Sequence, residues 1–171
     1  MDFKSFIHDV PDFPKQGILY RDISPLLRNP EALSSAAKHL AALVRNYPID
    51  KVVAVESRGF IFGSLLAHIL NAGFVMVRRQ NKLPRPVESL EYSLEYGNSI
   101  IEIHPEDIEK GENVLIHDDV IATGGTADAA SRLVEKVGGN IAACAFLVEL
   151  RSLGGREKLD HYPFHSLVSL D

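Results

Sequence analysis

The sequence predicts an α/β fold with a mainly parallel central sheet flanked by helices, and three observations support this. After the first thirty residues, runs of β-branched apolar residues alternate with amphipathic helical stretches, as in βαβ units. The length of 171 residues is enough for one domain with a buried core. Apolar residues make up 46% and charged residues 24%, as in globular proteins. We therefore expect a single domain over residues 1–171.

The first half of the chain contains one clear βαβ unit. Asn29 and Pro30 are typical of a helix cap and a first helical residue, so a helix begins there. Apolar spacing then predicts the following order: a helix at about 30–46, a strand at 51–56, a helix over 61–70 closed by Gly73, and a strand at 74–78.

A long segment at residues 79–97 follows, with two prolines, mixed charge and no clean period. It exceeds the ~12–15 residues of ordinary connecting loops, so a functional flap, a hairpin and a disordered stretch are all open interpretations. From residue 98 to the end of the chain, apolar runs and helix-end signals again predict regular strands and a helix. We expect strands at 98–103, 113–118, 140–150 and 164–170, and a helix that starts near Thr126 and is ended by Gly138 and Gly139.

Composition excludes several classes of function. No apolar run approaches the ~20 residues of a membrane span, and the N-terminal residues lack a basic segment followed by an apolar one, so we expect a cytoplasmic protein without a membrane partner. The single Cys144 lies in an apolar run and is interpreted as a small core residue. A net charge of −5 argues against a nucleic-acid partner, which normally requires a basic face.

The stretch 114–126, VLIHDDVIATGGT, carries the most specific signal. Ligands of parallel sheets bind at the carboxyl ends of strands, where a glycine turn and a helix N-terminus suit a phosphate. The hydroxyls of Thr123 and Thr126 can donate to phosphate oxygens, and Asp118 and Asp119 can accept from sugar hydroxyls. The alternative is an ordinary helix cap with solvated acids. No G-x-x-x-x-G-K-[ST] or G-x-G-x-x-G motif is present.

This stretch resembles the phosphoribosyl diphosphate (PRPP) motif of type I phosphoribosyltransferases. The resemblance implies a parallel sheet with a small hood over the site, with Asp118 and Asp119 at the ribose. It implies that the 5-phosphate is bound by Ala122, Thr123, Gly124, Gly125 and Thr126. One departure is His117, where the family usually has an apolar residue. His117 is either a satisfied strand histidine or a group that tunes Asp118 near neutral pH.

Further stretches narrow the resemblance to the adenine-specific phosphoribosyltransferases. These are GILYRDISPLL (17–27), VVAVESRGFIFG (52–63), YSLEYG (92–97) and LVELRSLGGREKL (147–159). The match therefore covers nearly the whole chain. It implies that residues 1–30 form the base-binding hood segment and that residues 79–97 form the family's flexible loop.

The same resemblance assigns the diphosphate contacts. Ser57, Arg58 and Gly59 match the family's diphosphate loop, and Arg58 is also a candidate catalytic residue. A guanidinium suits the bidentate geometry of a diphosphate. Arg78 and Lys82 match further diphosphate-contacting cations.

The base site also follows from the resemblance. Glu95 matches the carboxylate that the family uses beside the base, and is the candidate acid/base, with Tyr96 as its aromatic neighbour. The resemblance points to backbone groups around Leu19 and Arg21, where a carbonyl would accept from the 6-amino group of adenine. A 6-oxo purine would leave such a carbonyl unsatisfied, at ~1–3 kcal/mol per contact.

The expected function is transfer of the phosphoribosyl group from PRPP to adenine, giving AMP and diphosphate. Mg²⁺ is implied, bound mainly through PRPP and diphosphate, so no dedicated metal ligand is assigned to the protein. The family resemblance implies a homodimer. Two alternatives stay open: a 6-oxopurine or pyrimidine phosphoribosyltransferase, and a non-catalytic regulator that senses PRPP.

Overall fold

The computed structural model describes residues 1–93 and 97–171. The strands are β1 (His8–Pro11), β2 (Leu19–Asp22), β3 (Lys51–Val55), β4 (Gly73–Arg79), β5 (Glu88–Ser93), β6 (Asn98–Ile103), β7 (Asn113–Ile121), β8 (Asn140–Leu150) and β9 (Phe164–Leu170). The helices are α1 (Ser24–Arg28), α2 (Pro30–Val44), α3 (Gly59–Leu70) and α4 (Gly125–Lys136). The 3₁₀ helices are η1 (Phe3–Phe6), η2 (Pro105–Asp107), η3 (Arg151–Leu153) and η4 (Gly155–Leu159).

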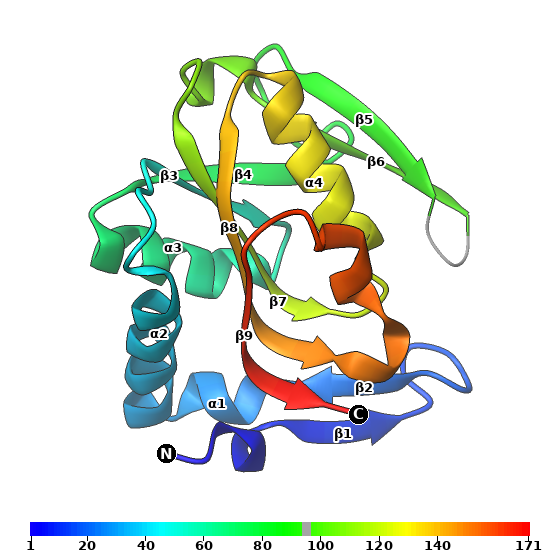
Figure 1. Ribbon diagram of the computed structural model, residues 1–171. Helices are drawn as coiled ribbons and strands as arrows, with labels where there is room; N and C mark the ends of the chain where they lie inside the picture. Colours follow the sequence, from blue (N-terminus) through cyan, green and yellow to red (C-terminus); the bar gives the residue numbers. More distant parts are fainter. Residues whose placement is uncertain (94–96) are drawn as a thin grey trace.

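Within the described ranges, a seven-stranded sheet has the strand order β5-β6-β4-β3-β7-β8-β9 (Figure 1). Strands β4, β3, β7, β8 and β9 run parallel to one another. Strand β6 is antiparallel to both β4 and β5, so this pair extends one edge of the sheet. The predicted α/β class with a mainly parallel sheet is confirmed.

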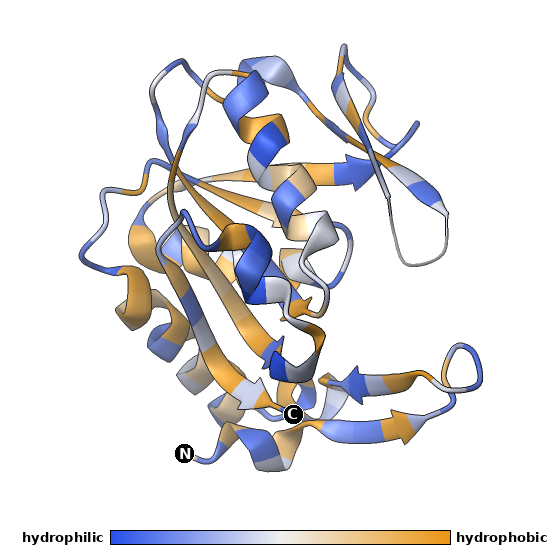
Figure 2. Cartoon of the chain, turned by 45° about the vertical axis from the view of Figure 1, so that its right-hand side comes forward, coloured by the Kyte–Doolittle hydropathy of each residue, from blue (hydrophilic) through white to orange (hydrophobic). Residues whose placement is uncertain are grey.

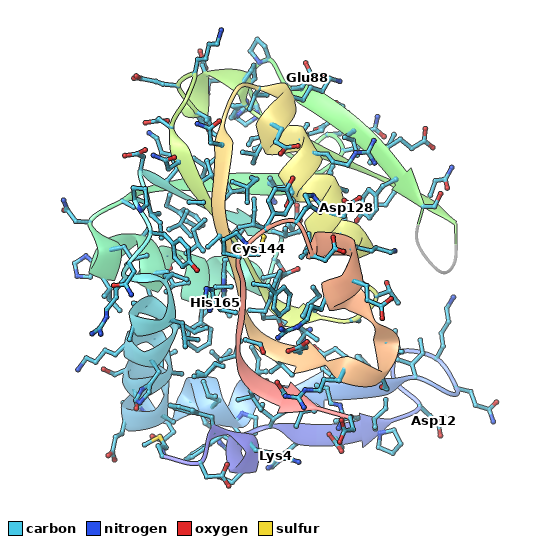
Figure 3. All side chains as sticks on the ribbon, in the orientation of Figure 1. Lys4, Asp12, Glu88, Asp128, Cys144 and His165 are labelled. Carbon is cyan, nitrogen blue, oxygen red and sulfur yellow. The ribbon has the colours of Figure 1, made fainter. Side chains whose placement is uncertain are left out.

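Helices cover both faces of the sheet. Alternate residues of a strand point to opposite faces, so Leu115 packs in the cluster beneath α2 and α3 while Ile116 packs in the cluster beneath α4. Figure 2 shows the apolar residues concentrated in the central strands and many of the hydrophilic ones in the loops. Cys144 is buried on β8 near the middle of the molecule, as expected for a core residue (Figure 3).

The helix boundaries follow mostly from local signals. The side chain of Asn29 accepts a hydrogen bond of 2.9 Å from the Ala32 N–H, and Pro30 is the first residue of α2, as predicted. The expectation that Gly73 closes α3 was wrong. Asn71 ends this helix with a φ of 54°, and its N–H donates to carbonyls of the last turn, whereas Gly73 begins β4.

An antiparallel hairpin, β1–β2, was not predicted from the sequence. In Figure 1 it lies beneath the carboxyl ends of β7, β8 and β9. Of the three interpretations of residues 79–97, the described part agrees with a hairpin, because β5 pairs with the following strand β6. Arg85 is paired with Glu106 and with Asp107, which ties the turn before β5 to η2.

Among the described residues, no helix is long and apolar enough to cross a membrane.

Candidate active site

The two acids and the glycine turn lie at the carboxyl end of β7, in the predicted order of strand, turn and helix. Strand β7 extends beyond its predicted end at residue 118, because its pairing with β8 continues to Ile121 opposite Glu149. The turn runs directly into α4. A cavity of about 90 Å³ lies here, lined by Asp118, Val120, Ile121, Ala122, Thr123, Gly124, Gly125, Thr126 and Ala127.

The turn is held by a close backbone contact with η4. Gly124 has a φ of +77°, which favours glycine, and a Cβ on it would lie 2.4 Å from the carbonyl oxygen of Gly155. A Cβ on Gly155 would lie 2.2 Å from the carbonyl oxygen of Ala122. Only glycine fits at either position. Gly155 was not singled out as a site residue, although the adjacent glycines 154 and 155 were a visible signal.

Asp118 is packed against the first residue of α3. A Cβ on Gly59 would lie 2.7 Å from Asp118 Oδ1, so Gly59 permits the helix to approach the acid. Asp118 Oδ1 also accepts a hydrogen bond of 2.8 Å from the Asp119 N–H. Burial raises the pKa of the Asp118 carboxyl well above its usual range, and the charge of Asp119 raises it further.

Asp119 is buried and faces a cation. Its Oδ2 lies 2.8 Å from Arg58 Nε, an ion pair whose orientation does not make a hydrogen bond, so Oδ2 has no hydrogen-bond partner among the described residues. Burial raises the pKa of Asp119, and the positive charge of Arg58 offsets part of this effect. The pair thus leaves an acceptor oxygen on Asp119 that a polar ligand can satisfy.

Arg58 also contacts the N-terminal hairpin. Its Nη1 donates a hydrogen bond to the Tyr20 hydroxyl, and its guanidinium carbon lies 4.6 Å from the centre of the Tyr20 ring. Tyr20 was not among the predicted site residues. Its two neighbours, Leu19 and Arg21, were, and only the fold shows that Tyr20 reaches Arg58.

Two larger cavities adjoin the turn. One of about 700 Å³ is lined by both predicted base-site residues, Leu19 and Arg21, and by Ala122, Thr123 and Leu150. The other, of about 680 Å³, is lined by Ser57, Asp118, Asp119, Arg79 and Tyr92. Both are lined by Tyr20 and Arg58, and Val120 and Thr126 line all three cavities. The three cavities, which share Val120 and Thr126, are therefore lined by these predicted residues: Leu19, Arg21, Ser57, Arg58, Asp118, Asp119, Ala122, Thr123, Gly124, Gly125 and Thr126.

The predicted cations Arg78 and Lys82 do not line these cavities. Arg78 Nε lies 3.2 Å from Glu56 Oε2, and its Nη1 donates to the Lys82 carbonyl at 3.0 Å. Burial acts to raise the pKa of Glu56, but hydrogen bonds from the Arg79 N–H and from Arg78 lower it overall. Arg79, which was not a candidate, lines the 680 Å³ cavity instead.

Two predicted residues, Glu95 and Tyr96, lie outside the described residues. Strand β5, which precedes them, reaches the glycine turn. The hydroxyls of Tyr92 and Thr126 lie 3.2 Å apart and share a hydrogen bond. Tyr92 was quoted within YSLEYG but was not assigned a role, and its position beside α4 follows only from the pairing of β5 with β6.

His117 on β7 is buried and has a hydrogen-bond partner on Nδ1, whereas its Nε2 has none among the described residues. Its Nδ1 lies 2.8 Å from the Ala145 carbonyl oxygen, and burial lowers its pKa to about 4. The imidazole is therefore neutral near pH 7, with Nδ1–H as the donor. This favours the structural interpretation over tuning of Asp118 by a charged His117 near neutral pH.

A parallel sheet that carries a glycine turn and two adjacent aspartates at the carboxyl end of a central strand is typical of the phosphoribosyltransferases. Residues 22–168 match the family model described as "Phosphoribosyl transferase domain". An adenine phosphoribosyltransferase of Pseudothermotoga lettingae is 50% identical over 169 residues, covering 99% of each chain. The chain belongs to the adenine phosphoribosyltransferase family.

Solved structures give the same result. The adenine phosphoribosyltransferase of Thermoanaerobacter pseudethanolicus is 44% identical, with a TM-score of 0.96 over 99% of this chain and 98% of that one. The enzyme of Giardia lamblia, solved with 9-deazaadenine, is 38% identical, with a TM-score of 0.94 over 99% and 97% of the two chains.

Proposed function

We propose that this chain transfers the phosphoribosyl group of PRPP to adenine, giving AMP and diphosphate. The observation that carries the proposal is the meeting of three cavities at Val120 and Thr126. One cavity is lined by the glycine turn, one by the acid pair with Arg58, and one by the N-terminal hairpin. A phosphate, a ribosyl diphosphate and a base need these three neighbouring compartments.

The 5-phosphate is placed at the turn of residues 122–126. Backbone N–H groups at the start of α4, the helix dipole and the hydroxyls of Thr123 and Thr126 favour an anion there. Asp118 and Asp119 accept hydrogen bonds from the ribose hydroxyls, and the buried Oδ2 of Asp119 then gains the partner it lacks.

We place the diphosphate in the 680 Å³ cavity, against Ser57 and Arg58, which line it, and close to Gly59, which follows them in the chain. Arg58 is the predicted cation that lines this cavity, where its side chain is 33% exposed. Arg78 and Lys82 remain proposed diphosphate contacts by family resemblance. For Arg78, this role requires the exchange of its contact with Glu56 for one with the substrate.

The base is placed in the 700 Å³ cavity, where backbone groups of Leu19 and Arg21 read the edge of adenine. A carbonyl that accepts from the 6-amino group rejects a 6-oxo purine, roughly 5- to 150-fold per contact at ~1–3 kcal/mol. Glu95 is the proposed acid/base. A carboxyl group that exchanges a proton with one imidazole nitrogen of the base makes the other nitrogen a better nucleophile toward C1 of the ribose. Tyr96 is proposed as its aromatic neighbour.

Mg²⁺ fits this site as a partner of the substrate. Asp118 and Asp119 line the 680 Å³ cavity, and carboxylate oxygen is a ligand atom that Mg²⁺ prefers. The ion offsets the negative charge of the leaving diphosphate. We place it mainly on PRPP oxygens and water, as the family resemblance implies.

The working unit is proposed to be a homodimer in the cytoplasm. Apolar side chains of α3 and β4 are exposed on one side of the molecule, with Ile61 37%, Ile69 43%, Phe74 36% and Met76 40% exposed. The rings of Phe60 and Phe74 meet edge to face across α3 and β4. A second copy would cover this surface, and sedimentation at several concentrations tests this.

The function is tested by incubating the protein and Mg²⁺ with PRPP and each nucleobase in turn. The expected result is AMP from adenine and little product from hypoxanthine or guanine. Nucleotide formation from a 6-oxo purine in preference to adenine would overturn the proposed base. Absence of AMP would overturn the assignment. A nucleic-acid-binding regulator is not favoured, because the chain has a net charge of −5.

A further inference from the structure

Tyr20 stands at the boundary between the base cavity and the diphosphate cavity. It lies on β2, at the edge of the N-terminal hairpin, and lines both cavities. One edge of its ring meets Phe13, with centroids 5.1 Å apart and planes at 76°. Its face and hydroxyl are both occupied by Arg58.

Arg58 lies where a cation is not intrinsically stable. It is the residue before Gly59, the first residue of α3, and the positive end of a helix dipole disfavours a cation. Two contacts hold its side chain there. Its Nε pairs with Asp119 Oδ2 at 2.8 Å, and its Nη1 donates to the Tyr20 hydroxyl.

These two contacts join Arg58 to different parts of the site. The contact with Asp119 draws Arg58 toward the ribose compartment, where the acid is needed for hydroxyl groups. The contact with Tyr20 draws it along the boundary toward the hairpin. With both in place, the guanidinium is held by Nε and Nη1 at the lining of the 680 Å³ cavity, and Nη2 has no hydrogen-bond partner among the described residues. A fixed guanidinium loses less rotamer freedom when it binds a diphosphate.

We propose that Tyr20 is a positioning residue for Arg58, and that its hydroxyl strengthens binding of the diphosphate group of PRPP. The inference rests on the proposed function, because it takes the diphosphate as the ligand of Arg58. It adds that the N-terminal hairpin, which supplies the base compartment, also contributes to diphosphate recognition through one hydroxyl group. The contacts of the aromatic ring with Phe13 and Arg58 can therefore be separated experimentally from the hydrogen bond of the hydroxyl.

The test is a comparison of the unmodified chain with Tyr20→Phe, which keeps the ring and removes only the hydroxyl. Isothermal titration with Mg²⁺ present measures the affinities for PRPP, diphosphate and ribose 5-phosphate. We expect Tyr20→Phe to weaken PRPP and diphosphate binding about 5- to 10-fold, which converts to about 1–1.4 kcal/mol, the size of one typical intramolecular hydrogen bond. Ribose 5-phosphate affinity should stay within twofold, because this ligand carries no diphosphate.

A matched control is Tyr162→Phe, which removes a hydroxyl that donates to Glu135 on the exposed surface. It should leave all three affinities unchanged. Equal weakening of PRPP and ribose 5-phosphate by Tyr20→Phe would indicate a merely structural role and overturn the inference. A PRPP affinity of Tyr20→Phe within twofold of the unmodified chain would also overturn the inference. If the unmodified chain bound no PRPP, the proposed function itself would fail, and this inference with it.

Discussion

Gly155 packs against Ala122 without room for a side chain, since a Cβ on Gly155 would lie 2.2 Å from the Ala122 carbonyl oxygen. Gly124 meets Gly155 from the other side at a similarly short distance. The turn proposed to hold the 5-phosphate is thus positioned by η4, a segment distant in the sequence. Its shape depends on tertiary contact as well as on its own glycines.

Gly155→Ala is therefore expected to displace the turn and weaken PRPP binding. Overpacking at a rigid backbone contact costs ~1–3 kcal/mol, which corresponds to roughly 5- to 150-fold in affinity if the turn must shift to bind. Titration with PRPP and thermal unfolding measure the two effects. Gly73→Ala is the control, because its Cβ would meet only the flexible Lys51 side chain, at 2.8 Å. Equal losses of PRPP affinity in both variants would contradict the role given to Gly155.

Asp118→Asn is expected to stabilise the ligand-free protein at neutral pH and to weaken PRPP binding. Burial, with help from the charge of Asp119, raises the folded-state pKa of Asp118 above its usual value of 3.8. The folded state then holds a proton that the unfolded state releases, so ionisation of Asp118 lowers stability as pH rises from about 3.8 through the raised pKa. Asparagine removes this cost and also removes an acceptor for ribose hydroxyls.

Thermal unfolding between pH 4 and pH 8 measures this effect. The melting temperature of Asp118→Asn should exceed that of the unmodified chain at pH 8, and the gap should narrow toward pH 4. The exposed Asp160→Asn serves as the control for a surface acid. A constant gap across the range would exclude Asp118 as the cause. PRPP affinity of Asp118→Asn should fall about tenfold.

His117 should remain neutral through the range in which the enzyme works. Burial lowers its pKa from 6.5 to about 4, so its neutral form contributes stability that is fully present above 6.5 and lost as pH falls toward 4. The contribution is roughly 3 kcal/mol at most. Nitrogen NMR of the imidazole should show an Nδ1–H tautomer at pH 7 and a titration midpoint about 4. A midpoint near the ordinary value would restore His117 as a group that tunes Asp118.

Glu95→Ala should lower turnover much more than it lowers PRPP affinity. Loss of a general acid/base typically costs about 10²- to 10⁴-fold in rate, whereas the ribose and phosphate contacts are unaffected. Steady-state rates and PRPP titration on the same variant separate the two quantities. Glu91→Ala, on neighbouring β5, is the matched control. An unchanged rate in Glu95→Ala would remove this residue from the mechanism.

Local patterns were sufficient to predict most of the sheet and the helices around it. The cap of α2 and the strand–turn–helix order after residue 113 depend on neighbouring residues, so the sequence predicts them directly. The β1–β2 hairpin was missed because it has no alternating apolar pattern, and all four residues of β1 are exposed. A tertiary contact joins it to the sheet, because Arg21 Nη2 on β2 donates a hydrogen bond of 2.8 Å to the backbone oxygen of Asp171, which follows β9.

The candidate site was predictable where one stretch carries it and not where distant stretches meet. Asp118, Asp119 and the turn come from a single motif. The contact of Tyr20 with Arg58 joins β2 to α3, and the pairing of Arg78 with Glu56 joins β4 to the end of β3. Neither contact has a sequence spacing that predicts it. Family resemblance alone therefore assigned Arg78 to the ligand, while the fold pairs it with a carboxylate.

The central claim is that the turn at residues 122–126 and the acids Asp118 and Asp119 bind the ribose 5-phosphate part of the substrate. A crystal structure of the protein with AMP tests this most directly. The account predicts the nucleotide phosphate within hydrogen-bonding distance of the N–H groups of the turn, and the ribose hydroxyls against the two carboxylates. Clear density for AMP elsewhere, with the turn unliganded, would contradict it.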